Sequence, residues 1–396
     1  MTETFSGSFT QQEPIPDEAI EAALAVLRHG RLHRYNLAKG ELGETALLEQ
    51  EFAAQTGARY CLAVASGGYA MATALRAVGV GPGDAVLTNA FTLAPVPGAI
   101  ASVGARPVFV GVTESLTIDL DDLAAKAGTA QVLMLSHMRG HLCDMDRLMQ
   151  ICDDAGITVI EDCAHTMGAA WNGVPSGRQG AVGCYSCQTY KHVNSGEGGL
   201  LVTDDEEIAA RAVMMSGSYM LYERHLAAPG PEVFERIKYH TPNISGRMDN
   251  LRAAILRPQL RALDAQVARW NERYQRIEAG LRGTPGLTVI ERPEAETYVG
   301  SSIQFLLLDW AADKVQEALR RCAVRGVELK WFGTPEPVGF TSRYDSWRYA
   351  ESAPMPASDR VLAGIIDMRV PLTFSLEDCD LIARIIRVEV GAVYQS

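Results

Sequence analysis

Residues 183–199 read GCYSCQTYKHVNSGEGG and place Lys191 in a short polar segment between two apolar runs. The runs at 183–187 and 199–203 have the length and composition of buried strands. Small polar residues and glycines surround the lysine, as expected where a backbone passes close to a ligand. A lysine with few competing charges can lose its proton and attack a carbonyl carbon. A solvated surface lysine is the alternative interpretation.

A second stretch, VIEDCAH at residues 159–165, ends an apolar strand with Asp162. Pyridoxal phosphate (PLP) requires an amine for a Schiff base and a carboxylate beside its pyridine nitrogen. Lys191 and Asp162 supply these two groups, so their pairing predicts a PLP site. For Asp162 alone, a helix cap is the alternative.

The composition of the 396-residue chain is that of a globular protein with an acidic surface. A net charge of -12 and a pI of about 5.2 argue against nucleic-acid and anionic-membrane partners, because both would repel it on average. The first residues, MTETFSGS, show neither a basic region nor an apolar stretch, and no run of about 18 apolar residues occurs. We therefore expect a cytoplasmic protein.

Eight cysteines lie mostly inside apolar runs, which is typical of reduced, buried thiols. Cys184 and Cys187 form a CxxC pair, but a strand would place them on opposite faces. No second Cys/His pair with zinc spacing accompanies them. We expect no metal site.

Short apolar runs alternate with helical stretches over residues 15–215, a pattern typical of a parallel sheet with helices on both faces. The expected strands are residues 60–65, 85–87, 107–110, 132–135, 157–160, 183–187 and 199–203, with helices at 69–78 and 144–155. A long helix is expected over about 249–281, with Pro258 as its one kink or break.

The chain is longer than one hydrophobic core usually supports, so we expect two domains. The first, residues 1–265, is the α/β domain that would hold the cofactor. The second, residues 266–396, is expected to be a smaller α+β domain. Its predicted elements are a strand at 302–308 and helices at 312–325 and 376–388.

The turn Ser66-Gly67-Gly68 follows a strand and opens a helix. Its N–H groups and the helix dipole would face an anion such as a phosphate at the carboxyl edge of the sheet. Alone the turn is weak support, because small-residue turns between strand and helix are common. His165, three residues after Asp162, is either at the cofactor ring or a satisfied core histidine.

Several further segments, in their order, resemble the sugar aminotransferases of the DegT/DnrJ/EryC1/StrS family, which are PLP enzymes of fold type I. The segments are GPGDAV (81–86), GARPVFV (104–110), HMRGH (137–141), IEDCAH (160–165), GEGG (196–199) and RMDNLRAA (247–254). With Val370-Pro371-Leu372 before a final helix, the resemblance extends over most of the chain.

The resemblance implies a PLP-transferase fold of type I with a seven-stranded sheet. It implies that Lys191 forms the Schiff base and acts as general acid and base, and that Asp162 partners the pyridine nitrogen. It places His165 at the ring, Ser186 at the phosphate and segment 1–45 near the substrate mouth. It also implies a homodimer in which each active site borrows residues from the other subunit.

Three departures from the family pattern bear on the cofactor site. The turn reads Gly67-Gly68-Tyr69 where the family usually has a threonine, so backbone N–H groups must carry more of the phosphate binding. Leu93 stands where the family stacks an aromatic ring, so either aliphatic contact suffices or Tyr69 moves in. The segment Asn243 to Arg247 replaces the family's Gly-Tyr-Asn-Tyr-Arg. The resemblance implies that either Asn243 or Arg247 reaches the partner's site, and Arg247 is the one carried over as a cofactor-site residue.

Arg34 and Tyr35 lie in a stretch, residues 28–44, that is rich in basic and aromatic groups. Arg34 is a candidate for an acidic substrate group, because a guanidinium binds carboxylate or phosphate through two parallel hydrogen bonds. A solvated loop charge is the alternative. Trp331 is a candidate for contact with a sugar ring, with core packing as the alternative.

These features predict a PLP-dependent aminotransferase that moves an amino group from glutamate or glutamine to a keto or aldehyde carbon. The expected acceptor is a sugar, sugar nucleotide, sugar acid or cyclitol; no motif distinguishes among them. One alternative is a PLP-dependent sugar dehydratase, but such relatives replace the lysine by histidine. Another is a non-catalytic sensor, which would be expected to lose Lys191 or Asp162. A PLP decarboxylase or aldolase would not carry GEGG in this register.

Overall fold

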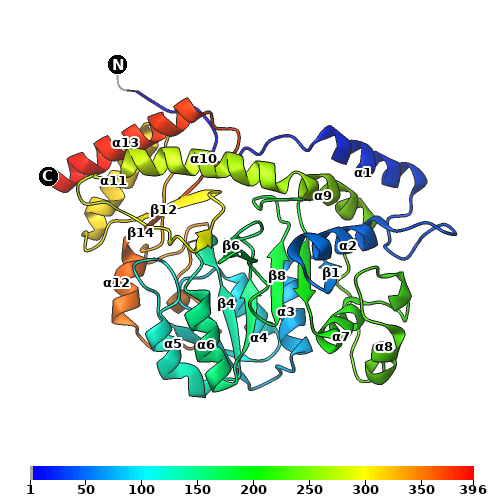
Figure 1. Ribbon diagram of the computed structural model, residues 1–396. Helices are drawn as coiled ribbons and strands as arrows, with labels where there is room; N and C mark the ends of the chain where they lie inside the picture. Colours follow the sequence, from blue (N-terminus) through cyan, green and yellow to red (C-terminus); the bar gives the residue numbers. More distant parts are fainter. Residues whose placement is uncertain (1–2, 340) are drawn as a thin grey trace.

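A mainly parallel seven-stranded sheet forms the centre of the protein in the computed structural model, which describes residues 3–339 and 341–396 (Figure 1). Its strands are β1 (Tyr60–Val64), β2 (Ala85–Asn89), β3 (Arg106–Val110), β4 (Val132–Ser136), β5 (Thr158–Asp162), β8 (Val182–Ser186) and β9 (Gly199–Thr203). The spatial order is β1-β9-β8-β5-β4-β2-β3, with β9 antiparallel to both neighbours and the remaining pairs parallel. The predicted fold class is confirmed.

Helices cover both faces of this sheet because successive strand residues alternate between two apolar cores. In β1, Leu62 and Val64 face one core and Cys61 and Ala63 face the other. The helices around the sheet are α1 (Asp17–His29), α2 (Glu44–Thr56), α3 (Gly67–Ala77), α4 (Pro95–Ser102), α5 (Leu120–Lys126), α6 (Met145–Ala155), α7 (Glu206–Ser216), α8 (Pro231–Ile237) and α9 (Asn250–Arg261). Ligand-binding loops are therefore directed to the carboxyl edge of the strands.

A smaller antiparallel sheet lies beside the C-terminal helices (Figure 1). Its strands, in spatial order, are β10 (Thr288–Val289), β12 (Ser302–Leu306), β14 (Ile365–Arg369) and β13 (Lys330–Trp331), and its helices are α10 (Leu263–Leu281), α11 (Ala312–Val324), α12 (Pro356–Gly364) and α13 (Leu376–Gln395). Phe5 and Phe9 pack edge-on against Phe374, each at 5.0 Å between ring centroids. The start of the chain thus belongs to this second core.

Short elements complete the fold. A three-stranded sheet joins β11 (Glu296–Thr297), β6 (Ala170–Trp171) and β7 (Val174–Pro175), and so connects segments from the two parts of the chain. The 3-10 helices are η1 (Ala127–Thr129), η2 (Met138–Gly140), η3 (Tyr222–Arg224) and η4 (Tyr344–Ser346).

The long helix expected over 249–281 is two helices, α9 and α10, that lie end to end (Figure 1). The prediction of a break at Pro258 is wrong, because Pro258 lies inside α9 and is buried there. The chain turns instead at Ala262, where φ is -92° and ψ is -1° and the N–H donates to the carbonyl of Gln259. Packing of the buried proline offsets the single hydrogen bond that it cannot donate.

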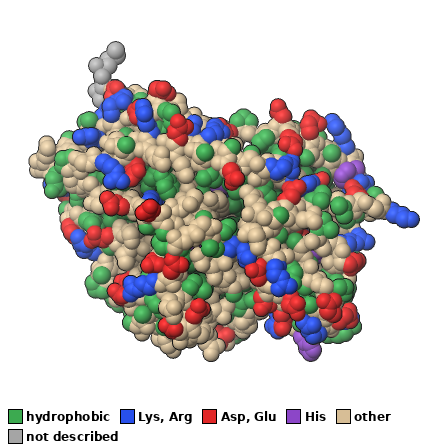
Figure 2. Space-filling view, in the orientation of Figure 1, with side chains coloured by type: hydrophobic (Ala, Val, Ile, Leu, Met, Phe, Trp, Pro, Cys, Tyr) green, Lys and Arg blue, Asp and Glu red, His purple; other side chains and the backbone are tan. Residues whose placement is uncertain are grey.

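Acidic and basic side chains are interspersed over the face seen in Figure 2. The excess of acidic residues is therefore not gathered into one field on that face. Among the described residues, no helix is both long and apolar enough to cross a membrane. All eight cysteines are buried and unpaired, including Cys184 and Cys187, which confirms the prediction of buried thiols.

Candidate active site

A cavity of about 650 Å³ lies at the carboxyl ends of the parallel strands. This volume falls within the range of about 300–1,000 Å³ that small-molecule sites occupy. Seven of the predicted site residues line it, namely Gly67, Gly68, Leu93, Asp162, His165, Ser186 and Lys191. Strands and loops far apart in the sequence thus converge on one space, as expected at this edge of an α/β sheet.

Lys191 lies in the turn between β8 and β9, and its side chain lines the cavity. The Nζ atom is 2.8 Å from Nε2 of His165. Burial lowers the pKa of the Lys191 amine to about 7, with Asp162 opposing the shift and Arg139 and Arg369 adding to it. A large share of the amine is therefore neutral near pH 7, the form that attacks carbonyl groups and accepts protons.

Asp162 ends β5 with its carboxylate at the cavity wall. Its Oδ1 accepts the Ala164 N–H at 3.1 Å, and its Oδ2 accepts the Ser136 hydroxyl at 3.1 Å. A carboxylate offers about four acceptor sites, so two remain for a ligand N–H. Burial raises the pKa of Asp162, and the charge of Lys191 opposes that rise. A turn, not a helix, follows Asp162, so it caps no helix.

The start of α3 forms an anion-binding turn beside Ser186. Ser66 caps the helix, because its Oγ accepts the Tyr69 N–H at 3.1 Å. Gly67 and Gly68 follow as the first helical residues, whose N–H groups have no acceptor within the helix. A Cβ at Gly67 would lie 2.9 Å from the Ser186 Cβ, so only glycine permits this approach. The turn and the serine hydroxyl together fit a phosphate.

The glycine pair that ends the lysine segment has a packing cause as well. A Cβ at Gly199 would lie 2.4 Å from the backbone of Ser66, so β9 can pass beside the phosphate turn only with glycine there. Gly198 has a φ of 155°, a value that strains other residues. The glycines of the GEGG segment therefore let β9 pass beside the phosphate turn, and Glu197 of the same segment lines the cavity.

Leu93 lines the cavity and Tyr69 does not. The Tyr69 hydroxyl donates to the carbonyl of Met215 at 3.1 Å, and its ring occupies the space where a Cβ of Gly246 would stand. Tyr69 is therefore held away from the place of the missing aromatic. Of the two alternatives, the structure favours aliphatic contact through Leu93.

The His165 ring lies between Lys191 and the backbone of η2. Its Nδ1 accepts the N–H of Arg139 at 3.3 Å, while its Nε2 faces Lys191. Burial first, and then the positive charges around it, lower the pKa of His165 well below its usual range. The ring is therefore neutral at physiological pH and lies in the cavity wall, not in the core.

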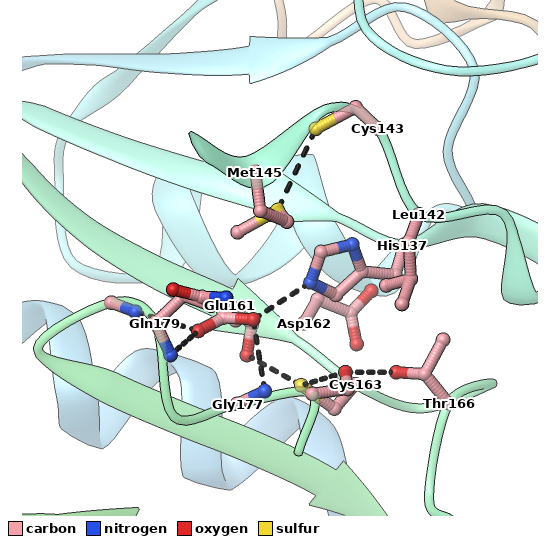
Figure 3. A network of polar contacts seen from close by, with 12 residues as sticks. His137, Leu142, Cys143, Met145, Glu161, Asp162, Cys163, Thr166, Gly177 and Gln179 are labelled. Carbon is pink, nitrogen blue, oxygen red and sulfur yellow. Dashed lines mark hydrogen bonds and ion pairs between the residues drawn. The ribbon is translucent and has the colours of Figure 1, made fainter. Parts of the chain in front are cut away.

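A buried network centred on Glu161 fixes the end of β5 directly behind Asp162 (Figure 3). The Glu161 carboxylate accepts four hydrogen bonds of 2.7 to 2.9 Å, from His137 Nε2 and from the N–H groups of Gly177, Gln179 and Gly180. The backbone N–H of His137 also donates a hydrogen bond to the carbonyl of Asp162. Because neighbouring strand residues point to opposite faces, anchoring Glu161 directs Asp162 into the cavity.

Three residues of this network, His137, Glu161 and Cys163, are close enough to be considered as ligands of a metal ion. Their ligand atoms all lie within 4.8 Å of one another. Each oxygen of Glu161 already accepts two hydrogen bonds, so its acceptor sites are filled. The cluster is therefore a hydrogen-bonded anchor and not a metal centre.

The structure does not bring Arg34 and Tyr35 to the cavity. Arg34 makes two parallel hydrogen bonds of 2.8 and 2.9 Å to the Glu49 carboxylate, and both side chains are buried. The Tyr35 hydroxyl is 2.7 Å from Nε2 of His225. Arg34 is thus neither a substrate ligand nor a solvated charge, because α2 supplies a buried carboxylate that occupies its guanidinium.

Trp331 and Arg247 also lie outside the cavity lining. Trp331 packs in the second core and donates its Nε1–H to the carbonyl of Ala363 at 2.7 Å, which favours the packing alternative. Arg247 donates to the carbonyl of Gly217 and lies over the Tyr219 ring at 5.0 Å. Within one subunit, therefore, Arg247 does not contact the space that holds Lys191.

Sequence reasoning missed two arginines in the cavity wall, Arg139 and Arg369. Both lie in or next to segments that carried the family resemblance, HMRGH and the residues before Val370-Pro371. Gln12 and His192 also line the cavity. No spacing rule marks these residues, because β14 and the N-terminal segment reach the site only through the packing of the second core.

A family model for the DegT/DnrJ/EryC1/StrS aminotransferase family matches residues 15–387. A UDP-2-acetamido-2-deoxy-3-oxo-D-glucuronate aminotransferase of Pseudomonas aeruginosa is 31% identical over 287 residues, 70% of this chain and 74% of that protein. A pleiotropic regulatory protein of Geobacillus stearothermophilus is 32% identical over 238 residues, 59% of each chain.

The match spans about 60% of the length of several such relatives. The crystal structure of 3-amino-5-hydroxybenzoic acid synthase superposes with a TM-score of 0.82 at 24% identity, covering 97% of this chain and 99% of that one. The fold therefore agrees over nearly the whole length. The chain belongs to the DegT/DnrJ/EryC1/StrS aminotransferase family.

Proposed function

We propose that the protein is a PLP-dependent aminotransferase that moves an amino group from glutamate or glutamine to an oxo carbon of a sugar, sugar nucleotide, sugar acid or cyclitol. One observation carries the proposal: Lys191, with a pKa of about 7, and the buried carboxylate of Asp162 line one cavity. Names of relatives such as UDP-2-acetamido-2-deoxy-3-oxo-D-glucuronate aminotransferase support the sugar-type acceptor.

The residues that would hold PLP divide between its two ends. Gly67, Gly68 and Ser186 would bind the phosphate, and Asp162 would accept a hydrogen bond from the pyridine nitrogen. His165 and Leu93 would contact the ring. When bound, PLP supplies a conjugated electron sink for negative charge at the carbon that carries the amine.

Lys191 has the properties of the group that moves the proton. Its amine accepts a proton near neutral pH because burial disfavours the charged form. It can return that proton because Asp162 keeps part of the charged form stable. A base with a pKa near the working pH serves both directions of transfer.

Chemical labelling tests the role of Lys191. Borohydride reduction of the PLP-loaded protein, followed by peptide mass mapping, should place a pyridoxyl group on Lys191. A label on another lysine, or no label, would end the assignment. A panel of keto-sugars offered to protein first loaded with an amino group from glutamate then identifies the acceptor.

A non-catalytic sensor is the second candidate, favoured by the relative named a pleiotropic regulatory protein. The two candidates differ in one measurement. A sensor would bind PLP but leave its absorbance unchanged when glutamate is added, whereas an aminotransferase shifts it within seconds to minutes. A dehydratase is disfavoured by Lys191, since the dehydratase relatives carry histidine there.

We also propose a homodimer with shared active sites, in which Arg247 reaches the partner's cavity. Lys191→Ala and Arg247→Ala proteins, each inactive alone, should recover activity when their subunits are exchanged. Half of the dimers are then mixed, and each has one site with both defects and one with neither, so about a quarter of wild-type activity is expected. A fully active monomer, or no recovery, would contradict the shared site.

Two coarser features complete the proposal. A cofactor-holding domain over residues 1–265 and a smaller domain over 266–396 are supported by the two separate sheets. A cytoplasmic location is supported by eight unpaired, buried thiols.

A further inference from the structure

Three polar side chains at the ends of neighbouring strands form a hydrogen-bonded row that ends at Asp162. Asn89 ends β2, Ser136 ends β4 and Asp162 ends β5, and the spatial order β2-β4-β5 places them side by side. All three are buried. Ser136 and Asp162 line the cavity that holds Lys191, whereas Asn89 is not part of its lining. Asn89 therefore has no direct contact with a ligand in that cavity.

Asn89 supplies the pairing that the backbones of β2 and β4 lack at this end. The backbone register of the two strands stops at Thr88 and Met134, one residue before Asn89. From there the side chain of Asn89 continues the contact. Its Oδ1 accepts the Ser136 N–H at 2.8 Å, and its Nδ2 donates to the Ser136 carbonyl at 3.0 Å. One side chain thus holds both backbone polar groups of Ser136.

The orientation of the Asn89 amide is determined by its partners. Its Nδ2 donates to two carbonyl oxygens, those of Ser136 and Phe91, at 3.0 and 2.9 Å. A flipped amide would place its oxygen against both carbonyls, so only one orientation fits. Breaking any of these hydrogen bonds would leave a buried polar group without a partner, which is costly. The backbone of Ser136 is therefore fixed in place.

With its backbone fixed, Ser136 presents its hydroxyl to the Asp162 carboxylate. The two residues lie opposite each other in the parallel register of β4 and β5, and the Ser136 Oγ donates to Oδ2 of Asp162 at 3.1 Å. Burial raises the pKa of Asp162, and the Ser136 hydroxyl is one of the groups that oppose this rise. A donated hydrogen bond has this effect because it stabilises a carboxylate more than a carboxylic acid.

The remaining groups around Asp162 also favour its charged form. The charge of Lys191, the Ala164 N–H and His137 each lower the pKa of Asp162. Glu161, its neighbour in β5, points to the opposite face and is occupied by four hydrogen bonds. Replacing Ser136 alters none of these groups, so its contribution can be measured alone.

We propose that Asn89 and Ser136 are positioning residues that set where the proton lies between Asp162 and the pyridine nitrogen of PLP. The inference rests on the proposed function and deepens it, because a protonated nitrogen makes PLP a stronger electron sink. While Ser136 donates to Oδ2, the carboxylate keeps its negative charge and the proton stays on the nitrogen. Without that donor, Asp162 becomes a stronger base and draws the proton toward itself.

Nitrogen NMR measures the position of this proton. Solid-state ¹⁵N spectra are recorded on the full-length protein loaded with PLP that is labelled at the pyridine nitrogen, with free PLP at low and high pH as the two references. We expect Ser136→Ala to move the equilibrium about 10-fold toward the neutral nitrogen, the effect of losing one hydrogen bond to a charged group. This variant keeps both backbone hydrogen bonds to Asn89, so its fold should be retained.

Thr284→Val is the matched control for the loss of a buried hydroxyl. The Thr284 hydroxyl donates to the carbonyl of Leu281 at 2.7 Å, and the residue lies outside the cavity lining. We expect this variant to leave the nitrogen resonance unchanged. An unchanged resonance in Ser136→Ala, or an equal shift in Thr284→Val, would overturn the proposal.

The role of Asn89 is tested through its dependence on Ser136. Asn89→Ala removes three hydrogen bonds, and Asn89→Ser, which keeps a hydroxyl, replaces it if the alanine variant does not fold. Either change should move the resonance in the same direction as Ser136→Ala. Adding it to Ser136→Ala should produce no further movement, because Asn89 acts only through the serine hydroxyl. Additive shifts, or no shift from Asn89 alone, would remove Asn89 from this role.

The half-reaction with glutamate separates this role from direct contact with a substrate. A positioning role lowers kcat in Ser136→Ala and leaves the KM for glutamate unchanged, whereas a raised KM with normal kcat would overturn it. If the proton moves as expected but no amino group is transferred by the wild-type protein, the aminotransferase is refuted and the positioning role stands. Wild-type protein that binds no PLP would overturn both.

Discussion

Arg34 and Arg139 are both buried arginines paired with a carboxylate, and they have opposite relations to the cavity. Arg34 is 3% exposed, and Glu49 occupies its fork through two hydrogen bonds. Arg139 lines the cavity; its Nη2 lies 2.8 Å from the Asp367 carboxylate outside hydrogen-bond geometry, and its buried Nε has no hydrogen-bond partner among the described residues. The first pair is closed and structural, whereas the second is open on the side of the cavity.

The difference shows that burial and charge do not by themselves mark a functional arginine. Arg34 and Arg139 differ in whether neighbouring side chains accept hydrogen bonds from the N–H groups of the guanidinium. The cluster around Glu49 adds His225 and the backbone N–H of Ala63 to the same carboxylate, so every charge has a partner. Functional sites are the places where such satisfaction is left incomplete.

The largest effect should follow from removing the amine of Lys191, which lines the same cavity as Arg139. Lys191→Ala is expected to lower the rate of amino transfer about 10⁴-fold, because both the nucleophile and the proton carrier are lost. Its thermal stability should not fall, since a desolvated amine leaves the interior. Stopped-flow absorbance with glutamate measures the rate. Retained activity would remove Lys191 from the chemistry.

Breaking the buried cluster of Arg34, Glu49 and His225 should lower the free energy of unfolding instead of the reaction rate. Glu49→Ala leaves the Arg34 guanidinium buried without a carboxylate, which costs about 3–5 kcal/mol of unfolding free energy. Denaturant titration measures the loss. The double variant Arg34→Met with Glu49→Leu should recover most of it, and Glu41→Ala, at the more exposed Arg31 pair, should change far less. An equal loss in both glutamate variants would refute the contrast.

Asp162→Asn tests the carboxylate beside the reactive lysine and should have a smaller effect. The amide still accepts the Ala164 N–H, so PLP should bind, but the charge that holds a pyridine nitrogen protonated is gone. We expect the half-reaction with glutamate to slow about 100-fold, ~2.7 kcal/mol on the barrier. Ser136→Ala, which removes one hydrogen bond to Asp162, should slow it less. A normal rate in Asp162→Asn would leave Asp162 a structural role only.

The smallest effect, taken per pH unit, is a pH dependence of stability in the cofactor-free protein. The pKa of Lys191 falls from 10.5 to about 7 on folding, so the unfolded chain binds more protons between these values. Stability contributed by Lys191 is therefore fully present above pH 10.5, falls as the pH falls, and is lost below about 7. The slope is at most ~1.4 kcal/mol per pH unit. Unfolding curves of Lys191→Met should lack it, and a slope shared by both proteins would contradict the shifted pKa.

Much of the fold was predictable because it depends on local patterns. Apolar runs of five residues separated by helices predict a parallel sheet, and the strands lie within two residues of the expected positions. Lys191, Asp162, Ser186 and the turn at Gly67 follow strands of one sheet, so their convergence at its carboxyl edge follows from topology. The position of the helix break could not be predicted in this way. Proline disfavours a helix interior, so the sequence indicated Pro258, but the chain turns at Ala262.

By itself, the sequence determined the α/β sheet and the residues at its carboxyl edge, because period, turn chemistry and strand ends are local properties of the chain. Only the tertiary structure decided which charged groups face the cavity. Glu49 on α2 closes off Arg34, while β14 of the small sheet brings Arg369 and Asp367 to Arg139. Asp367 lies more than 200 residues from Arg139 in the chain, and Glu49, although nearer in sequence, reaches Arg34 only through the packing of α2. The charge and burial of a side chain depend on such partners.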